Sequence, residues 1–268
     1  GHFNPKKIDD SFSLNVFRNY LNDIDGQHRF FLQSDINNFK RYQKEIDDQI
    51  KSSEISFFNL TYNRLMSRIE QVEGFYEEIL TTPFDFKTND SINLNFEKLP
   101  YAKTLNGLKA IWRKRFKLST LEYYSSLKEQ QSLDMKQDSS YQFKSDLVLE
   151  EQARAKTNEN IKNYFDIISD IERKDWFSIY VNTITMGFDP HSNYFAPDDK
   201  EKFDQNISGK FEGIGARLQK KSQEVEITEI IVGGPVWKAK ALEVGDVILK
   251  VAQKLSLIHI SEPTRPLT

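Results

Sequence analysis

The segment over residues 211–251 constrains the fold most, because turn residues and apolar residues recur in it in a fixed order. The predicted elements are a glycine-rich loop at 211–216, a strand from 217, a half-buried strand at 225–232, a short helix from 233, a tight turn at 244–246 and a strand at 247–251. The alternation of Val225, Ile227 and Ile230 has the period of a strand with one buried face. The segment therefore predicts a small β-rich module.

The glycine-rich loop carries the clearest chemical signal in the chain. Two glycines that flank one apolar residue can turn successive backbone N–H groups toward a single anion, such as the terminal carboxylate of a peptide. The strand that follows offers its edge to the incoming peptide, and Ile214 and Leu218 are expected to line the pocket for its last side chain. The predicted peptide-binding residues are Gly213, Ile214, Gly215, Ala216, Arg217 and Leu218. The alternative from the residues alone is a generic small β-domain with an ordinary Gly-x-Gly turn.

The first two-thirds of the chain predict helices. Ile36, Phe39, Tyr42, Ile46 and Ile50 recur three or four residues apart, which predicts one helix with Ser34 as its N-cap. A second stripe predicts a helix over 58–79, and further helices are expected over 105–124, 147–172 and 175–186. Residues 83–100 are expected to form a loop.

The predicted fold class is α+β, a mainly α-helical N-terminal domain followed by an incomplete β-rich domain. The predicted boundaries are a helical domain at 1–187, a connecting segment at 188–210, the partial β-rich domain at 211–253 and a tail at 254–268. Gly187 is expected to end the last helix as a left-handed C-cap. The tail fits neither domain and resembles translated vector or sequencing-adapter read-through.

Composition excludes several classes of protein. A net charge of −3 with 29% charged residues lacks the basic excess of a nucleic-acid binder. No apolar run is long enough for a transmembrane helix. The chain has no cysteine, so disulfides, thiolate metal sites and a cysteine nucleophile are excluded. We expect no metal and no cofactor.

Two clusters of polar residues are weaker candidates for chemistry. Asp189, His191 and Ser192 could suggest a catalytic triad or a metal site, but neighbours in one turn seldom reach the required mutual geometry. The acidic pair Asp47-Asp48 is expected to lie on solvated helix surface, since adjacent helical residues point about 100° apart. We therefore predict no catalytic residue in this chain.

Several motifs resemble one family, the tail-specific or C-terminal processing serine proteases, over residues 12–253. The motifs shared with the family at large lie at 189–194, 211–216 and 244–248, and those shared with its large periplasmic branch lie at 31–36, 62–64 and 83–86. The resemblance implies a helical domain, then a PDZ domain, then a protease core with a Ser nucleophile and a Lys general base. It also implies substrates with apolar C-terminal tails and a periplasmic location.

The chain departs from this family pattern in two ways. The PDZ domain of the family continues past Gln253 to a second helix that forms the other wall of the groove, and the protease core follows it. We therefore expect this chain to recognise tails but to hydrolyse nothing by itself. The chain begins at Gly1 without a signal-type segment, so we expect the natural N-terminus and any export signal to lie upstream.

The alternative function is a non-enzymatic adaptor, in which the helical domain docks a partner and the PDZ domain presents tails. The helices could equally be scaffold for the protease core, or a surface for an adaptor or for self-association. The expected partners are the C-terminal tails of protein substrates.

Overall fold

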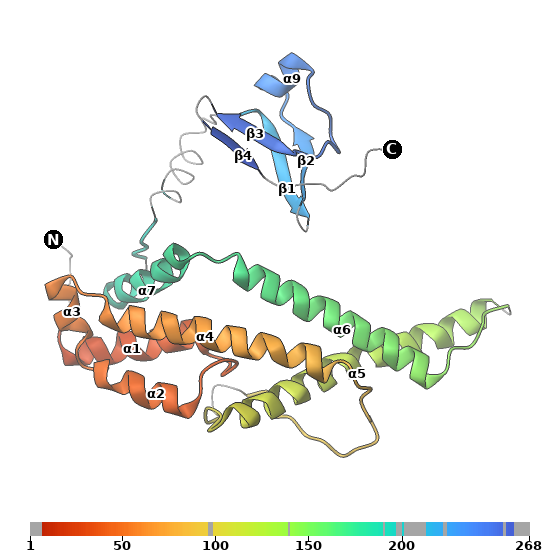
Figure 1. The fold of residues 1–268 in the computed structure, drawn as a ribbon, viewed down its shortest axis with the longest axis horizontal. Helices are drawn as coiled ribbons and strands as arrows, with labels where there is room; N and C mark the ends of the chain where they lie inside the picture. The colour runs from red at the N-terminus through yellow and green to blue at the C-terminus, as the bar shows by residue number, and fades with distance from the viewer. Residues whose placement is uncertain are drawn as a thin grey trace. The chain divides into compact units, whose positions relative to one another are not determined.

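The computed structural model describes residues 7–95, 99–138, 140–189, 191–196, 200, 213–221, 224–253 and 256–259. The chain divides into two compact units, Gly1–Ala196 and Pro197–Thr268, which we call the helical unit and the β unit. The helices of the helical unit are α1 Asp10–Asp25, α2 Gln33–Phe39, the 3-10 helix η1 Lys40–Tyr42, α3 Ile46–Ser52, α4 Ser56–Ile79, α5 Leu105–Gln137, α6 Asp146–Ser169 and α7 Arg173–Phe188 (Figure 1). The predicted α+β class with a helical N-terminal domain is confirmed.

Three of the helices, α1, α5 and α6, begin where a polar side chain accepts hydrogen bonds from the first free backbone amides. Asp9 Oδ1 accepts hydrogen bonds from the N–H groups of Ser11 and Phe12 at the start of α1. Thr104 caps α5 in the same way, and Ser145 caps α6. The predicted helix over 58–79 is confirmed as α4, and α5 extends well past the predicted residue 124 to Gln137.

The single helix predicted from Ile36 to Ile50 is wrong. The chain forms α2, η1 and α3 instead, with turns between Tyr42 and Ile46. The apolar residues still meet the core because the turns change the direction of the chain while Ile36, Phe39 and Ile46 stay buried. Ser34 is not the N-cap of α2. Leu32 holds that position, and its N–H donates to Asp35 Oδ2 at 2.9 Å.

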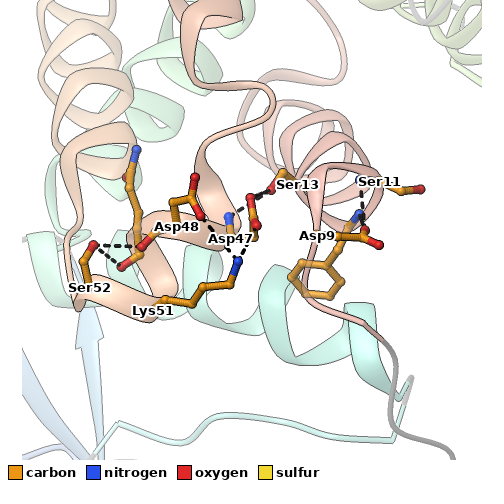
Figure 2. Close-up of polar contacts among 9 residues, drawn as sticks. Asp9, Ser11, Ser13, Asp47, Asp48, Lys51 and Ser52 are labelled. Carbon is orange, nitrogen blue, oxygen red and sulfur yellow. Dashed lines mark hydrogen bonds and ion pairs between the residues drawn. The ribbon is translucent and has the colours of Figure 1, made fainter.

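A buried pair of side chains fixes α3 against α1. The Ser13 hydroxyl donates to Asp47 Oδ1 at 2.7 Å, and the Asp47 N–H donates to Ser13 Oγ at 2.9 Å. Figure 2 shows Lys51 reaching the carboxylates of both Asp47 and Asp48, and its hydrogen bond to Asp47 lowers the pKa of that carboxyl. The prediction that this acidic pair is solvated surface is therefore wrong for Asp47, which is buried, and correct for Asp48.

Aromatic rings fill the core of the helical unit. Tyr20 on α1 lies 5.7 Å from Phe57 on α4 and 4.9 Å from Tyr180 on α7, measured between ring centroids. Phe58 packs on Tyr180 at 5.8 Å. The rings join α1, the first helix of the unit in sequence, to α4 and to α7, the last. Such ring pairs stabilise the fold beyond the free energy gained by burying their apolar surface.

A buried ion pair joins α2 to α4. Asp35 accepts hydrogen bonds from Arg68 Nε at 2.8 Å and from Arg68 Nη2 at 3.0 Å, and Arg64 Nε lies 3.3 Å from Asp35 Oδ1. The two oxygens of one carboxylate thus bind a planar guanidinium in the bidentate geometry that favours arginine over lysine. Asp35 and Arg64 both belong to the motifs that resemble the periplasmic proteases, so these motifs have a structural role here.

Gly187 does not end the last helix. The helix α7 continues to Phe188, and Asp189 is its C-cap with an extended backbone. A Cβ at Gly187 would lie 3.0 Å from the ring of Phe12, so the glycine permits close packing of α7 on α1 rather than a left-handed turn. The predicted loop at 83–100 is confirmed for its described residues.

The β unit contains an antiparallel pair, β1 Ala216–Lys221 and β2 Glu224–Ile230, then the short helix α9 Pro235–Ala239 and a second pair, β3 Lys250–Gln253 and β4 Ser256–His259. Residues 245–248 run along β2, where the Ile227 N–H donates to the Asp246 carbonyl at 2.9 Å and the Ile248 N–H donates to the Val225 carbonyl at 2.8 Å. The predicted strand over 247–251 is therefore only partly correct, because Val247 forms an isolated bridge and β3 begins at Lys250.

Two predicted segments lie largely outside the described residues. The connecting segment 188–210 is described only at 188–189, 191–196 and 200, and the tail 254–268 only along the backbone of β4. Among the helices that the structure describes, none has both the length and the apolar composition to cross a bilayer.

Candidate functional site

The predicted peptide-binding residues lie together on one loop and the strand that it leads into. Residues 213–215 form a bend, and Ala216, Arg217 and Leu218 are the first residues of β1. Phe211 and Glu212 of the same motif lie outside the described residues. Gly215 has a φ of +77°, in the left-handed region that favours glycine. This conformation turns the chain sharply into β1.

The loop packs closely against the segment that begins α9. A Cβ added at Gly215 would lie 2.9 Å from the Cα of Gly234 and 3.1 Å from the Pro235 ring. Any larger residue at position 215 would therefore push the two segments apart. The sequence interpretation did not include Gly234 in the site, although its place in Gly-Gly-Pro marks it as a turn residue.

The carbonyl groups of the loop and its amides differ in their hydrogen bonding. The Ile214 carbonyl accepts from the Val236 N–H at 2.9 Å, and the Gly215 carbonyl accepts from the Ile231 N–H at 2.8 Å. Within the described part of the chain, the N–H groups of residues 213–215 donate to no acceptor. The carbonyls thus fix the loop, and none of the described residues accepts a hydrogen bond from its amides.

The next amide belongs to β1 and points away from β2. Ala216 pairs with Ile230, and the hydrogen bond from Ile231 to Gly215 identifies this pair as the non-hydrogen-bonded type. Residues of such a pair direct their N–H and C=O groups to the outer edges of the strands. Among the described strands, β1 pairs with β2 alone, so this amide lies on an edge that a further strand can join.

The side chains around the loop are apolar and exposed. Ile214 is 45% exposed and Leu218 is 47% exposed, so neither is part of the core of the β unit. Arg217 is engaged across the sheet, where its Nη1 lies 2.8 Å from Glu229 Oε2. Two exposed apolar side chains therefore lie on the loop and on the strand that it leads into, and Arg217 is directed to its own sheet.

The cluster at Asp189, His191 and Ser192 forms a turn without the geometry of a catalytic triad. The N–H of His191 and its ring Nδ1 both lie near Asp189 Oδ1, at 2.9 Å and 3.1 Å, and the Ser192 N–H donates to the Asp189 carbonyl. The side chain of His191 is 91% exposed. Pro190 lies outside the described residues. No group of three acidic or histidine side chains in the described residues could hold a metal ion.

The fold and the loop together define a class, a helical domain joined in one chain to a β unit that carries a glycine-rich loop. Residues 1–198 match the family described as "Tail specific protease N-terminal domain". The chain therefore belongs to that family.

Curated relatives agree with this assignment. A protein from Haemophilus influenzae named "Tail-specific protease" is 26% identical over 253 residues, which is 94% of this chain and 34% of that protein. A "Probable CtpA-like serine protease" from Staphylococcus haemolyticus is 39% identical over 66 residues, 25% of this chain and 13% of that protein. One from Staphylococcus saprophyticus is 38% identical over the same length. The chain thus spans about a third of the length of the tail-specific protease that it matches.

Proposed function

We propose that this chain supplies substrate recognition to a serine endopeptidase that processes proteins with apolar C-terminal tails. The observation that carries this proposal is the loop at 213–216, whose amides have no acceptor among the described residues while its carbonyls are bound to Ile231 and Val236. A row of backbone N–H groups without acceptors is suited to a carboxylate.

The proposed complex is an added strand. The substrate tail pairs with the outer edge of β1, its terminal carboxylate accepts hydrogen bonds from the loop amides, and its last side chain packs on Ile214 and Leu218. Full burial of such a side chain contributes about 1.5–3 kcal/mol. We expect weak binding, because the described residues form only one wall of a groove. Without the second wall, about half of this free energy of burial is lost, which lowers the affinity roughly three- to tenfold.

The chemistry of cleavage is assigned to residues beyond this chain. In the proposed Ser–Lys mechanism, a desolvated neutral lysine takes the proton of the serine hydroxyl, so that no histidine is required. We propose a periplasmic location for the whole protein, as the family resemblance implies. This chain alone is expected to hydrolyse no peptide, and turnover of a tagged peptide by the purified chain would contradict that expectation.

The binding proposal is tested with two peptides that differ at one end. A fluorescent decapeptide ending in Ala-Val with a free carboxylate is expected to bind at least about tenfold more tightly than the same peptide with a C-terminal amide. Gly215→Ala introduces a clash with Gly234 and is expected to lower the affinity for the acid about tenfold, whereas a Cβ at Gly74 on α4, outside the loop, meets nothing within 4 Å. Gly74→Ala is therefore the matched control. Equal affinity for acid and amide, or equal effects of the two variants, would refute the proposed site.

A further inference from the structure

The helices α5 and α6 of the helical unit pack together (Figure 1). A cavity of about 260 Å³ is lined by residues from both helices. Its lining from α5 consists of Trp112, Arg115, Phe116 and Ser119, which share one helix face because they lie three and four residues apart. Its remaining lining residues are Ile161 and Tyr164 on α6 and Arg29 from the segment between α1 and α2. This volume is below the roughly 300–1,000 Å³ of pockets for drug-sized ligands. The cavity fits a single residue or a small acid.

The polar groups of the cavity are mainly hydrogen-bond donors. The described lining residues include two arginines, a serine and a tyrosine, and none of them carries a carboxylate. Arg29 Nη1 donates to the Tyr164 hydroxyl at 3.1 Å, and Arg115 Nη2 donates to the Gln27 carbonyl at 2.7 Å. Among the described residues, no carboxylate lies within ion-pair distance of Arg29. The described lining of the cavity therefore favours an anion over a cation.

The electrostatics of the two arginines support this conclusion. Burial is the largest effect that lowers the pKa of Arg115 to about 10, and the positive charge of Arg29 is the second. Asp25 and Tyr164 have smaller effects, which raise this pKa. Asp25 itself binds the backbone amides of residues 29–31, and burial raises its pKa to about 7. The two guanidinium groups, both partly buried, thus repel each other. An anion between them would relieve that repulsion.

The rest of the lining is apolar. Trp112, Phe116 and Ile161 surround the cavity, and the Trp112 indole N–H is already bound to the Arg29 carbonyl at 2.8 Å. We propose that this cavity binds a carboxylate carried on an apolar or aromatic body, with the carboxylate at Arg29 and Arg115 and the body against Trp112. This chemistry is shared by the C-terminal residue of a polypeptide and by a free aromatic acid. The site is separate from the loop at 213–216 and does not rest on the function proposed above.

The test uses the whole chain and two probes that differ by one charge. N-acetyl-L-phenylalanine is expected to bind at least about tenfold more tightly than the neutral N-acetyl-L-phenylalaninamide in a calorimetric titration. Because the loop at 213–216 is also proposed to bind carboxylates, the titration is repeated with Gly215→Ala, and binding of the acid to the cavity is expected to persist. No binding of the acid, or equal binding of acid and amide, would overturn the proposal.

Variants then locate the bound acid. Arg29→Gln and Arg115→Gln are each expected to lower the affinity at least about tenfold, since each removes a charged donor. Arg113→Gln is the matched control, because Arg113 lies on the same helix, is exposed and contacts the Phe84 ring at 5.4 Å instead of lining the cavity. It is expected to change the affinity less than about twofold. An equal loss in Arg113→Gln and Arg115→Gln would overturn the assignment.

Two further measurements complete the test. If circular dichroism shows that an arginine variant is unfolded, Ser119→Phe fills the cavity without removing a charge and is expected to abolish binding of the acid, whereas unchanged binding would contradict the site.

The acid N-acetyl-Gly-Gly-Phe distinguishes the two sources of ligand. Affinity equal to that of the single residue supports the end of a polypeptide, and binding of the single residue alone supports a small acid.

Discussion

The two units of the chain use their apolar residues in opposite ways. The helical unit buries large side chains from each of its long helices, including Tyr20, Phe57, Leu108 and Phe165. In the described part of the β unit, the buried large apolar side chains are Ile227 and Val236. Its exposed ones are Ile214, Leu218, Ile231, Val232, Trp237, Val244, Val247 and Leu249. Stability is thus concentrated in the first unit, and the second presents apolar surface of the kind that binds other chains.

The largest expected effect is the loss of a core ring in the helical unit. Phe57 has no exposed surface and contacts Phe17, Tyr20 and Tyr180. Phe57→Ala is expected to lower the free energy of unfolding by about 3–5 kcal/mol, measured by chemical denaturation. The control Phe143→Ala removes a ring that is 68% exposed and should cost less than about 0.5 kcal/mol. Similar losses in the free energy of unfolding for the two variants would contradict the conclusion that the buried rings stabilise the helical unit.

The buried ion pair of the helical unit gives the next effect. Asp35→Ala leaves Arg68 buried without its carboxylate and is expected to cost about 3 kcal/mol. This value is at the low end for such pairs, because the side chain of Arg64 is 39% exposed and can reach water. Asp48→Ala removes an exposed partner of Lys51 and should cost no more than about 0.5 kcal/mol. A cost below 1 kcal/mol for Asp35→Ala would show that the pair contributes little.

The buried carboxyl of Asp25 predicts a dependence of stability on pH. Burial raises its pKa from the ordinary 3.8 to about 7, although the amides of Phe31, Arg29 and Phe30 lower it. The folded chain then binds more protons than the unfolded chain between about pH 4 and 7, so the contribution of this group to stability falls as pH rises through that range. Asp25→Asn is expected to flatten this slope in thermal unfolding at pH 5 and pH 7.5. An unchanged slope would show that other titrating groups cause the dependence of stability on pH.

The smallest effects come from two glycines in helices. Gly187→Ala places a methyl group 3.0 Å from the Phe12 ring and is expected to destabilise the helical unit by about 1 kcal/mol. A Cβ at Gly74 on α4 meets nothing within 4 Å, so Gly74→Ala is expected to stabilise the unit by about 0.5–1 kcal/mol through helix propensity. Thermal unfolding of both variants tests the opposite signs, and a shared sign would contradict the packing assigned to Gly187.

The sequence predicted most of the helical unit because apolar periodicity survives in long helices. The stripe of α4 was sufficient to locate that helix, whereas the one predicted N-cap, Ser34, was wrong because Leu32 holds that position. The break between α2 and α3 was not predictable in this way. Both short helices keep the same apolar spacing, and the contacts that separate them, such as Ser13 with Asp47, join residues 34 positions apart.

The candidate site was predictable as a set of residues and less so as an arrangement. The Gly-Ile-Gly-Ala sequence identified the loop, since a left-handed Gly215 and a following strand are local features. Its contact with Gly234 depends on how the chain returns after β2, which no local pattern specifies. The cavity beside Arg29 was missed for a similar reason, because it combines residues from α5, α6 and the segment after α1.

We propose that tail recognition belongs to the loop of the β unit while the helical unit supplies the stable fold. Hydrogen exchange of the whole chain, with and without a saturating peptide that ends in Ala-Val, tests this claim most directly. We expect slow exchange in α1, α4 and α7 in both samples, and protection of the amides of Ile214, Gly215 and Ala216 only when the peptide carries a free carboxylate. Equal protection of these amides by the amidated peptide, or none by the free acid, would contradict it.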